Sequence, residues 1–235
     1  MTRNAPPRSQ AREFPISAED RIFHSFTQAL AKARRFEEPY RHWLVEDVLP
    51  EDVMTELAGL EFPVAGVGDL SGKREYHNDT RHYIDAANIA AHPCAAALAH
   101  AFQAPRMARA VEAFFETDIE GTFLRIEYAQ DTSGFWLEPH TDLGVKRLTL
   151  LLYLPNGEGQ DDLGTDIYNG DKSWAKRAPF KANAAMAFVP GADTYHGFEA
   201  REIAGVRKSL ILNYVTTDWR AREQLCFPEA TVTRG

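Results

Sequence analysis

Two histidines and one aspartate in the second half of the chain have the types and spacing of a mononuclear metal site. His140 and Asp142 are separated by one residue, so on a β-strand both side chains leave the same face. His196 follows a later apolar run and can supply a third ligand. Two histidines and one carboxylate on one triangular face leave the opposite coordination positions open, which is the arrangement of non-haem Fe(II) oxygenases. We therefore predict that these three residues bind a metal ion.

The His-x-Asp triplet alone is a weak signal, because it occurs a second time at His77 and Asp79. Context separates the two occurrences. His140 and Asp142 stand at the start of a β-rich half, whereas His77 and Asp79 lie in a polar stretch ahead of alanine-rich helices, where we expect solvated surface. The remaining histidines have no partner pattern and are expected to be structural: His24, His42, His82, His92 and His100.

The first half of the chain predicts helices. Ser17 with Asp20 is a weak capping box, and it opens a helix that apolar residues at helical spacing continue until Pro39 ends it. Further helices are expected from Pro50, over 85–102 and over 105–115, and a loop or a pair of short strands is expected over 64–83.

From Gly121 onward short apolar runs alternate with turn residues. The runs cover 122–129, 148–154, 165–168, 184–189 and 207–215. Several short strands at such spacing predict a sandwich or barrel. The expected architecture is therefore helices first and then a compact all-β unit, in an α+β class that is mainly β.

The composition narrows the class of protein. A hydrophobic fraction of 44% and a charged fraction of 26% are those of an ordinary globular protein. The net charge of −8 and the lack of a long basic run argue against a nucleic-acid partner, and no apolar run approaches the length of a membrane span. Cys94 and Cys226 form no CxxC motif and favour reduced thiols. We expect a cytoplasmic protein that is monomeric or homodimeric.

The motifs together resemble the 2-oxoglutarate/Fe(II)-dependent dioxygenase superfamily, particularly its prolyl-hydroxylase-like branch. The resemblance rests on His140-Thr141-Asp142, on His196 and on Arg207-Lys208-Ser209. The flanking segments FLRIEYAQDTSGFWLEPHTD, KRLTLLLYLPN, DLGTDIY and GVRKSLILNYV also resemble strands of the family, over roughly 120–216. YRHWLVEDVLPEDVMTEL resembles the opening of that branch, whereas 64–118 match less clearly.

The resemblance implies a fold and a domain organisation. The core would be a double-stranded β-helix, a jelly-roll of the cupin-like kind, with the N-terminal helices packed on one face. A flexible leader (1–16) would precede a single dioxygenase domain (17–235). That domain would comprise a helical part (17–118), the jelly-roll core (119–217) and a C-terminal tail (218–235).

The resemblance also implies cofactors and their ligands. Fe(II), O2 and the co-substrate 2-oxoglutarate would be used, with succinate and carbon dioxide released and no catalytic residue beyond the metal ligands. Arg207 would grip the far carboxylate of 2-oxoglutarate, because a planar guanidinium binds a carboxylate bidentately and keeps its charge. Ser209 faces the same way on a strand and would add a hydrogen bond, and Tyr128 is a further candidate donor. The carboxylate of Asp142 favours hydroxylation over halogenation, since related halogenases lack it.

The substrate is less well defined. Hydroxylation of a small polar metabolite, either an amino acid or a sugar-like compound, is the first hypothesis, and hydroxylation of a protein side chain such as prolyl is the second. A third is a non-catalytic jelly-roll protein that binds a metal. Nucleic-acid demethylation is disfavoured, because that branch carries a second arginine where Asn213 stands here. The candidate substrate contacts are Trp136, Arg74, Tyr76 and Arg81.

Overall fold

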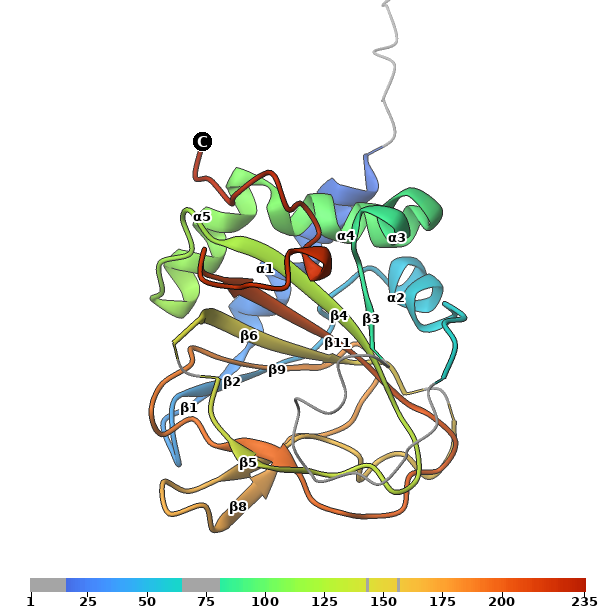
Figure 1. Ribbon diagram of the computed structural model, residues 1–235, viewed down its shortest axis with the longest axis vertical. Helices are drawn as coiled ribbons and strands as arrows, with labels where there is room; N and C mark the ends of the chain where they lie inside the picture. Colours follow the sequence, from blue (N-terminus) through green and yellow to red (C-terminus); the bar gives the residue numbers. More distant parts are fainter. Residues whose placement is uncertain (1–15, 65–80, 143, 156) are drawn as a thin grey trace, which may run out of the picture.

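A seven-stranded antiparallel sheet forms the centre of the molecule, with helices on one face and a four-stranded antiparallel sheet across the other (Figure 1). The computed structural model describes residues 16–64, 81–142, 144–155 and 157–235. All but the last residue of the predicted leader therefore lies outside the described residues. None of the helices in the described part is long and apolar enough to cross a membrane.

The first helix, α1 (Ala18–Lys32), begins at the predicted cap, where the Ser17 hydroxyl accepts a hydrogen bond from the Asp20 amide at 3.1 Å. The prediction that it continues to Pro39 is wrong. The chain leaves α1 after Lys32 and forms a hairpin of two strands, β1 (Arg34–Phe36) and β2 (His42–Val45). Pairing of β2 with the sheet buries Trp43, and this tertiary contact overrides the helical spacing of the apolar residues.

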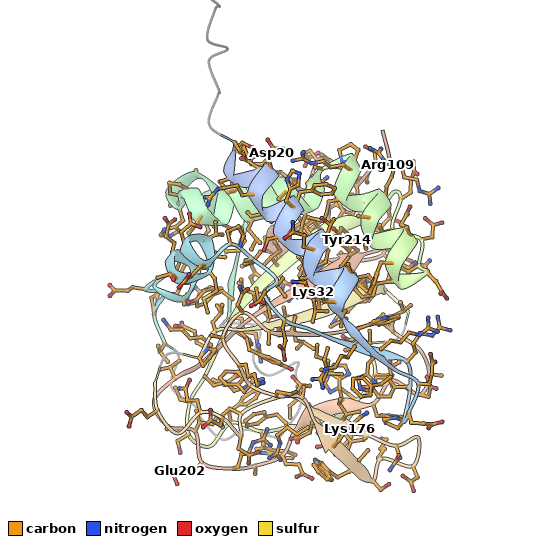
Figure 2. All side chains as sticks on the ribbon, turned by 180° about the vertical axis from the view of Figure 1, so that it is seen from behind. Asp20, Lys32, Arg109, Lys176, Glu202 and Tyr214 are labelled. Carbon is orange, nitrogen blue, oxygen red and sulfur yellow. The ribbon has the colours of Figure 1, made fainter. Side chains whose placement is uncertain are left out.

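The other helices complete one layer over the large sheet. They are α2 (Glu51–Ala58), α3 (Ala86–Ala91), α4 (Pro93–Gln103) and α5 (Pro105–Phe115), and a 3₁₀ turn, η2 (Arg222–Gln224), follows near the C-terminus. Helices α4 and α5 both start on proline, whose fixed φ and missing N–H suit the first helical position. Seen from behind, α1 crosses this layer from Asp20 to Lys32, while Lys176 and Glu202 lie toward the opposite end of the molecule (Figure 2).

The large sheet has the order β1-β2-β9-β6-β11-β4-β3 and the small sheet the order β5-β10-β7-β8. The remaining strands of the large sheet are β3 (His82–Tyr83), β4 (Phe123–Asp131), β6 (Lys146–Tyr153), β9 (Ala185–Phe188) and β11 (Arg207–Val215). Those of the small sheet are β5 (Leu137–His140), β7 (Asp166–Tyr168), β8 (Trp174–Arg177) and β10 (His196–Phe198).

All five predicted apolar runs are strands, namely β4, β6, β7, β9 and β11. The expected order of helices first and then an all-β unit holds only in part, because β1, β2 and β3 all precede residue 84 and pair into the large sheet. The sequence pattern did not reveal β8 and β10, because a strand of three or four residues is too short to show an alternation.

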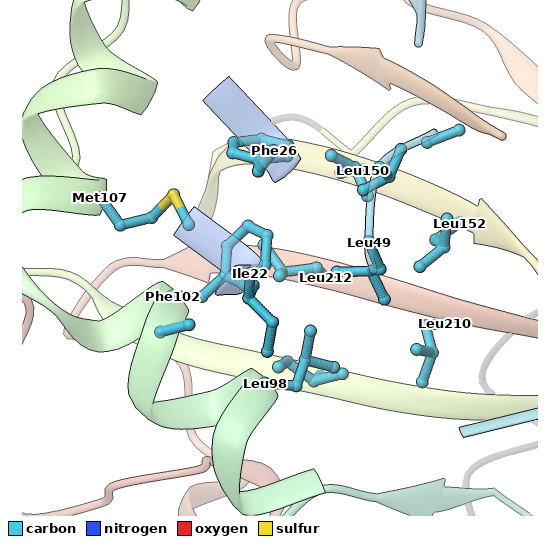
Figure 3. Close-up of a cluster of buried hydrophobic side chains, with 14 of the residues drawn as sticks. Ile22, Phe26, Leu49, Leu98, Phe102, Met107, Leu150, Leu152, Leu210 and Leu212 are labelled. Atoms are coloured by element: carbon cyan, nitrogen blue, oxygen red, sulfur yellow. The ribbon is translucent and has the colours of Figure 1, made fainter. Parts of the chain in front are cut away.

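Alternation along the central strands divides the interior into two cores. Leu210, Leu212 and Tyr214 of β11 face the helices, whereas Ile211 faces the small sheet. On the helical side, Phe26 of α1 meets Phe102 of α4, with ring centroids 5.1 Å apart, above the leucines of β6 and β11 (Figure 3). The core that holds the sheet in place therefore lies on the face away from the predicted metal ligands.

Polar side chains occupy much of the opposite face. Arg125, Glu127 and Asp131 alternate along β4 with apolar residues that face the helices, and Asn213 and Arg207 do so along β11. All five are buried. Buried charges of this kind are rarely retained without pairing or a ligand, so the space between the two sheets is where we look for a site.

Replacing Phe102 with alanine is expected to lower the free energy of unfolding by about 3–5 kcal/mol, because a buried aromatic ring is lost from the helix–sheet core. Urea denaturation measures the change. The exposed residue Ile16 serves as the control, and Ile16→Ala should alter stability by no more than about 0.5 kcal/mol. A loss below about 1 kcal/mol for Phe102→Ala would contradict the assignment of this core.

Candidate metal centre

Strand pairing brings the two predicted histidine ligands together. His196, the first residue of β10, lies opposite His140, the last residue of β5, and their ring centroids are 4.3 Å apart. Asp142 follows two residues after the end of β5, so it does not lie on the strand as the spacing suggested. Its side chain nevertheless lies beside both histidines. Oδ2 of Asp142 is 3.7 Å from Nε2 of His196, and Oδ1 is 4.0 Å from Nε2 of His140.

The backbone sets both imidazoles in the tautomer that a metal requires. Nδ1 of His140 lies 2.9 Å from the carbonyl oxygen of Glu138, and Nδ1 of His196 lies 3.1 Å from the carbonyl oxygen of Thr194. A carbonyl oxygen can only accept, so Nδ1 carries the proton in each neutral ring and Nε2 presents a lone pair. Metal-binding histidines are oriented in this way by backbone carbonyls.

One atom from each of His140, Asp142 and His196 can be chosen so that all three lie within 4.8 Å of one another. Asp142 and His196 are buried and His140 is partly exposed, so the group lies at the edge of the interior. Two imidazole nitrogens and one carboxylate oxygen suit a borderline divalent ion such as ferrous iron. The residues present therefore fit the predicted metal.

Two residues of β6 hold the carboxylate of Asp142. Thr149 donates a hydrogen bond to Oδ2 at 2.9 Å, and Nζ of Lys146 lies 2.7 Å from Oδ1. Both side chains are buried. These two contacts fix the orientation of the carboxylate, although Asp142 itself lies outside a strand.

Gly197 permits the close approach of β10 to β5. A Cβ atom at this position would lie 2.6 Å from the carbonyl oxygen of Leu137 and 3.0 Å from that of Glu138. Both are backbone atoms that cannot turn away. Only glycine therefore lets His196 come into register with His140.

Asp166 anchors the next strand of the small sheet, where it lies opposite Gly197. Its carboxylate accepts four hydrogen bonds, from Nε1 of Trp174, Nε of Arg177, the amide of Glu199 and Nη1 of Arg201. Burial alone would raise the pKa of Asp166, but these donors outweigh it and hold the pKa below its usual value of 3.8. The strand beside His196 is thus fixed by a residue that stays ionised at neutral pH.

A cavity of about 40 Å³ lies next to His196 between the two sheets. It is lined by Arg81, Asp131, Phe135, Leu137, Leu151, Thr165, His196, Gly197, Phe198, Arg207, Ser209 and Ile211. The strand residues that line it come from β4, β5, β6, β10 and β11, so its shape depends on the pairing of both sheets.

Arg207 and Ser209 both face this cavity, as predicted. Nε of Arg207 donates to the carbonyl oxygen of Leu163 at 2.7 Å, and Nη1 donates to Oδ2 of Asp131 at 2.5 Å. The hydroxyl of Ser209 is buried and has no hydrogen-bond partner among the described residues. A buried hydroxyl without a partner is costly. Together with the guanidinium beside it, this hydroxyl fits a site that accepts a carboxylate.

The structure places Tyr128 away from this cavity. Its side chain leaves the helix-facing side of β4, and its hydroxyl donates to the carbonyl oxygen of Leu57 at 3.0 Å. The prediction that Tyr128 binds the co-substrate is therefore not supported. This expectation failed because the sequence does not show which face of β4 carries the Tyr128 side chain.

The candidate substrate contacts have different outcomes. Arg81 lines the cavity, whereas Trp136 does not, and its neighbour Phe135 takes that place. Arg74 and Tyr76 lie outside the described residues, as does the second triplet of His77 and Asp79.

Sequence reasoning did not identify Asp131, Lys146 or Thr149 as parts of the site. Asp131 ends the apolar strand β4, on which Arg125 and Glu127 also face inward. Three charged residues on one face of an otherwise largely apolar strand were the available signal, since each must find a partner inside the protein. Nothing comparable marks Thr149.

No protein-family model matches the sequence, and no curated protein matches it. Several solved structures share its fold. A prolyl-4-hydroxylase from Pseudomonas putida aligns with a TM-score of 0.55 at 16% identity, over 87% of this chain and 98% of that chain. A prolyl hydroxylase from Trichoplax adhaerens, solved with a hypoxia inducible factor peptide, aligns with a TM-score of 0.54 at 14% identity, over 84% of this chain and 90% of that chain.

A third structure, a 2OG-Fe(II) oxygenase family oxidoreductase from Burkholderia pseudomallei, aligns with a TM-score of 0.51 at 14% identity, over 90% of this chain and 93% of that chain. The chain thus has the fold of the prolyl-hydroxylase-like 2-oxoglutarate/Fe(II) oxygenases. The resemblance stated from the motifs is confirmed at the level of the fold.

Replacing Gly197 with alanine is expected to lower the affinity for Mn(II) by about 10- to 100-fold, because the new Cβ atom pushes His196 away from His140. Calorimetric titration of the metal-free protein measures this affinity. Gly170→Ala is the matched control, since a Cβ atom there meets nothing within 4 Å. Equal affinities in the two variants would contradict the role given to Gly197.

Proposed function

We propose that the protein is a non-haem Fe(II)/2-oxoglutarate-dependent oxygenase that hydroxylates a C–H bond and releases succinate and carbon dioxide. The observation that carries this proposal is the position of a three-residue metal site beside a cavity that also holds Arg207 and Ser209. A bare metal site needs no such carboxylate-binding pair. The fold shared with prolyl hydroxylases supports the same conclusion.

In this proposal His140, Asp142 and His196 hold the iron through two imidazole nitrogens and one carboxylate oxygen. Iron, when bound with 2-oxoglutarate and O2, supplies the oxidising power that amino-acid side chains lack. The chain itself orients the ligands: the carbonyl oxygens of Glu138 and Thr194 fix the rings. Phe188 packs on His196, with ring centroids 4.7 Å apart, and helps to exclude water from that side.

Arg207 and Ser209 would receive the far carboxylate of the co-substrate. The hydrogen bonds of Arg207 within the described residues use Nε and Nη1, which leaves Nη2 to donate to a ligand. Ser209 lies two positions further along the same face of β11 and provides a hydroxyl. Because Leu163 and Asp131 hold the guanidinium in place, binding a carboxylate would cost little side-chain ordering.

We also propose that the two sheets form the double-stranded β-helix of this class and that residues 17–235 constitute one domain. In support, β1 to β3 pair into the same sheet as β4 and β11. Near the C-terminus, the amide of Cys226 donates to the carbonyl oxygen of Leu124, and Val232 is fully buried. The N-terminal and C-terminal parts thus complete the core instead of forming separate units.

For the substrate we propose a small polar metabolite, because the cavity beside His196 is small and its lining includes buried polar side chains such as Asp131 and Thr165. A protein side chain is the alternative, favoured by the fold likeness to prolyl hydroxylases. Comparing free amino acids with short peptides as stimulants of 2-oxoglutarate turnover separates the two.

Succinate formation from 2-oxoglutarate, with Fe(II) and oxygen but no added substrate, tests the proposed function. His140→Ala should abolish it, because one of three metal ligands is lost. Arg207→Ala should raise the 2-oxoglutarate concentration needed by about tenfold or more, since a charged hydrogen bond to a carboxylate contributes roughly 1.5–3 kcal/mol. His24→Ala, at an exposed histidine of α1, is the control and should behave like the parent protein. No succinate from the parent protein, or equal rates in all three variants, would refute the proposal.

A further inference from the structure

We propose that Arg81 is a second guanidinium of the co-substrate site, which together with Arg207 binds the far carboxylate and selects a dicarboxylic 2-oxoacid over a monocarboxylic one. This inference rests on the proposed function. The sequence suggested Arg81 as a contact of the substrate that is oxidised, and the proposal assigns it to the co-substrate instead.

Arg81 lies deep in the protein, immediately before the edge strand β3. Only 7% of its side chain is exposed. Because β3 pairs with β4 at Tyr83 and Glu127, the side chain of Arg81 extends over the inner face of β4. There it forms an ion pair with Glu127, while its Nη2 lies 3.9 Å from Oδ1 of Asp131.

The Nε–H donor of Arg81 lacks a partner in the part of the chain that the structure describes. Its Nε is buried and makes no hydrogen bond to any of the described residues. Leaving a donor of a charged group unsatisfied in the interior is costly. Because Arg81 lines the same cavity as Arg207 and Ser209, a ligand in that cavity can accept a hydrogen bond from this donor.

Arg125 shows what a purely structural arginine looks like in the same network. Its Nε donates to Gln224, its Nη1 to Asn213 and its Nη2 to Glu127, at 2.9, 3.2 and 2.7 Å. All three nitrogens are satisfied by the protein, and Arg125 does not line the cavity. Arg81 differs from Arg125 on both counts.

The charges of the network have room for one more anion. Three buried cations, Arg81, Arg125 and Arg207, are paired with two buried anions, Glu127 and Asp131. Burial opposes the charge of Arg81, but the two carboxylates outweigh it and raise the pKa of the guanidinium, which therefore remains charged. Among the described residues of this network one positive charge is left without an anion, and a single carboxylate would neutralise it.

The carboxylate of Asp131 lies between the guanidiniums of Arg81 and Arg207. Its Oδ2 accepts from Arg207 at 2.5 Å, and its Oδ1 faces Arg81 at 3.9 Å. One carboxylate thus holds two like charges near each other, which they would otherwise resist. A ligand carboxylate that enters the cavity meets both cations, with the hydroxyl of Ser209 as a further donor.

The test compares two co-substrates in the full chain loaded with Mn(II) in place of iron, so that no turnover occurs. Calorimetry gives the dissociation constants of 2-oxoglutarate and of pyruvate, which lacks the far carboxylate. Arg81→Gln is expected to weaken 2-oxoglutarate binding at least about tenfold, the loss of one charged hydrogen bond, and to leave pyruvate binding unchanged. Arg81→Lys keeps the positive charge but loses the planar pair of donors, so its affinity for 2-oxoglutarate should lie between those of the parent protein and Arg81→Gln.

Arg125→Gln is the matched control, because it removes a buried cation from the same network without changing the cavity lining. It should retain the parent preference for 2-oxoglutarate over pyruvate, and thermal melting of each variant shows whether it is folded. Unchanged 2-oxoglutarate affinity in a folded Arg81→Gln, or an equal loss for both oxoacids, would overturn the role of Arg81 while leaving the proposed function intact. A parent protein that binds Mn(II) but not 2-oxoglutarate would instead overturn the proposed function itself.

Discussion

The pairing of β10 with β5 is the contact on which the candidate site depends. It sets His196 opposite His140 and is possible only because Gly197 leaves the backbone oxygens of β5 unobstructed. The strands of the small sheet are short, and the sheet is stabilised by side chains such as Asp166, which accepts four hydrogen bonds from two segments of the chain. The predicted metal ligands are thereby held by backbone geometry and by a buried carboxylate, and not by an extended series of hydrogen bonds between long strands.

The large sheet serves two purposes on its two faces. Toward the helices it is apolar, and the packing of α1 and α4 against β6 and β11 supplies the stability of the fold. Toward the small sheet it carries alternating charges that would be costly without partners. Arg125 is fully satisfied by the protein, whereas Arg81 and Ser209 retain unused hydrogen-bonding atoms in the cavity. Arg81 and Ser209 both line the cavity beside His196.

The sequence predicted the parts of this arrangement that depend on local pattern. The apolar runs became strands, and the predicted ligand His196 lines the same cavity as Arg207 and Ser209. The sequence did not predict which face of β4 points inward, so Tyr128 was assigned to the site although it packs on the helices. Nor could the sequence show that α1 ends at Lys32 and that residues 34–45 form β1 and β2. These strands depend on the pairing of β2 with β9, which is far away in sequence.

The most direct test of the account is the visible absorption spectrum of the metal-free protein titrated with Fe(II) and 2-oxoglutarate in the absence of oxygen. The account predicts a metal-to-ligand charge-transfer band in the parent protein, and its loss in His140→Ala and in His196→Ala. A parent protein without the band, or a band that survives both substitutions, would contradict the assignment of His140, Asp142 and His196 as an iron site.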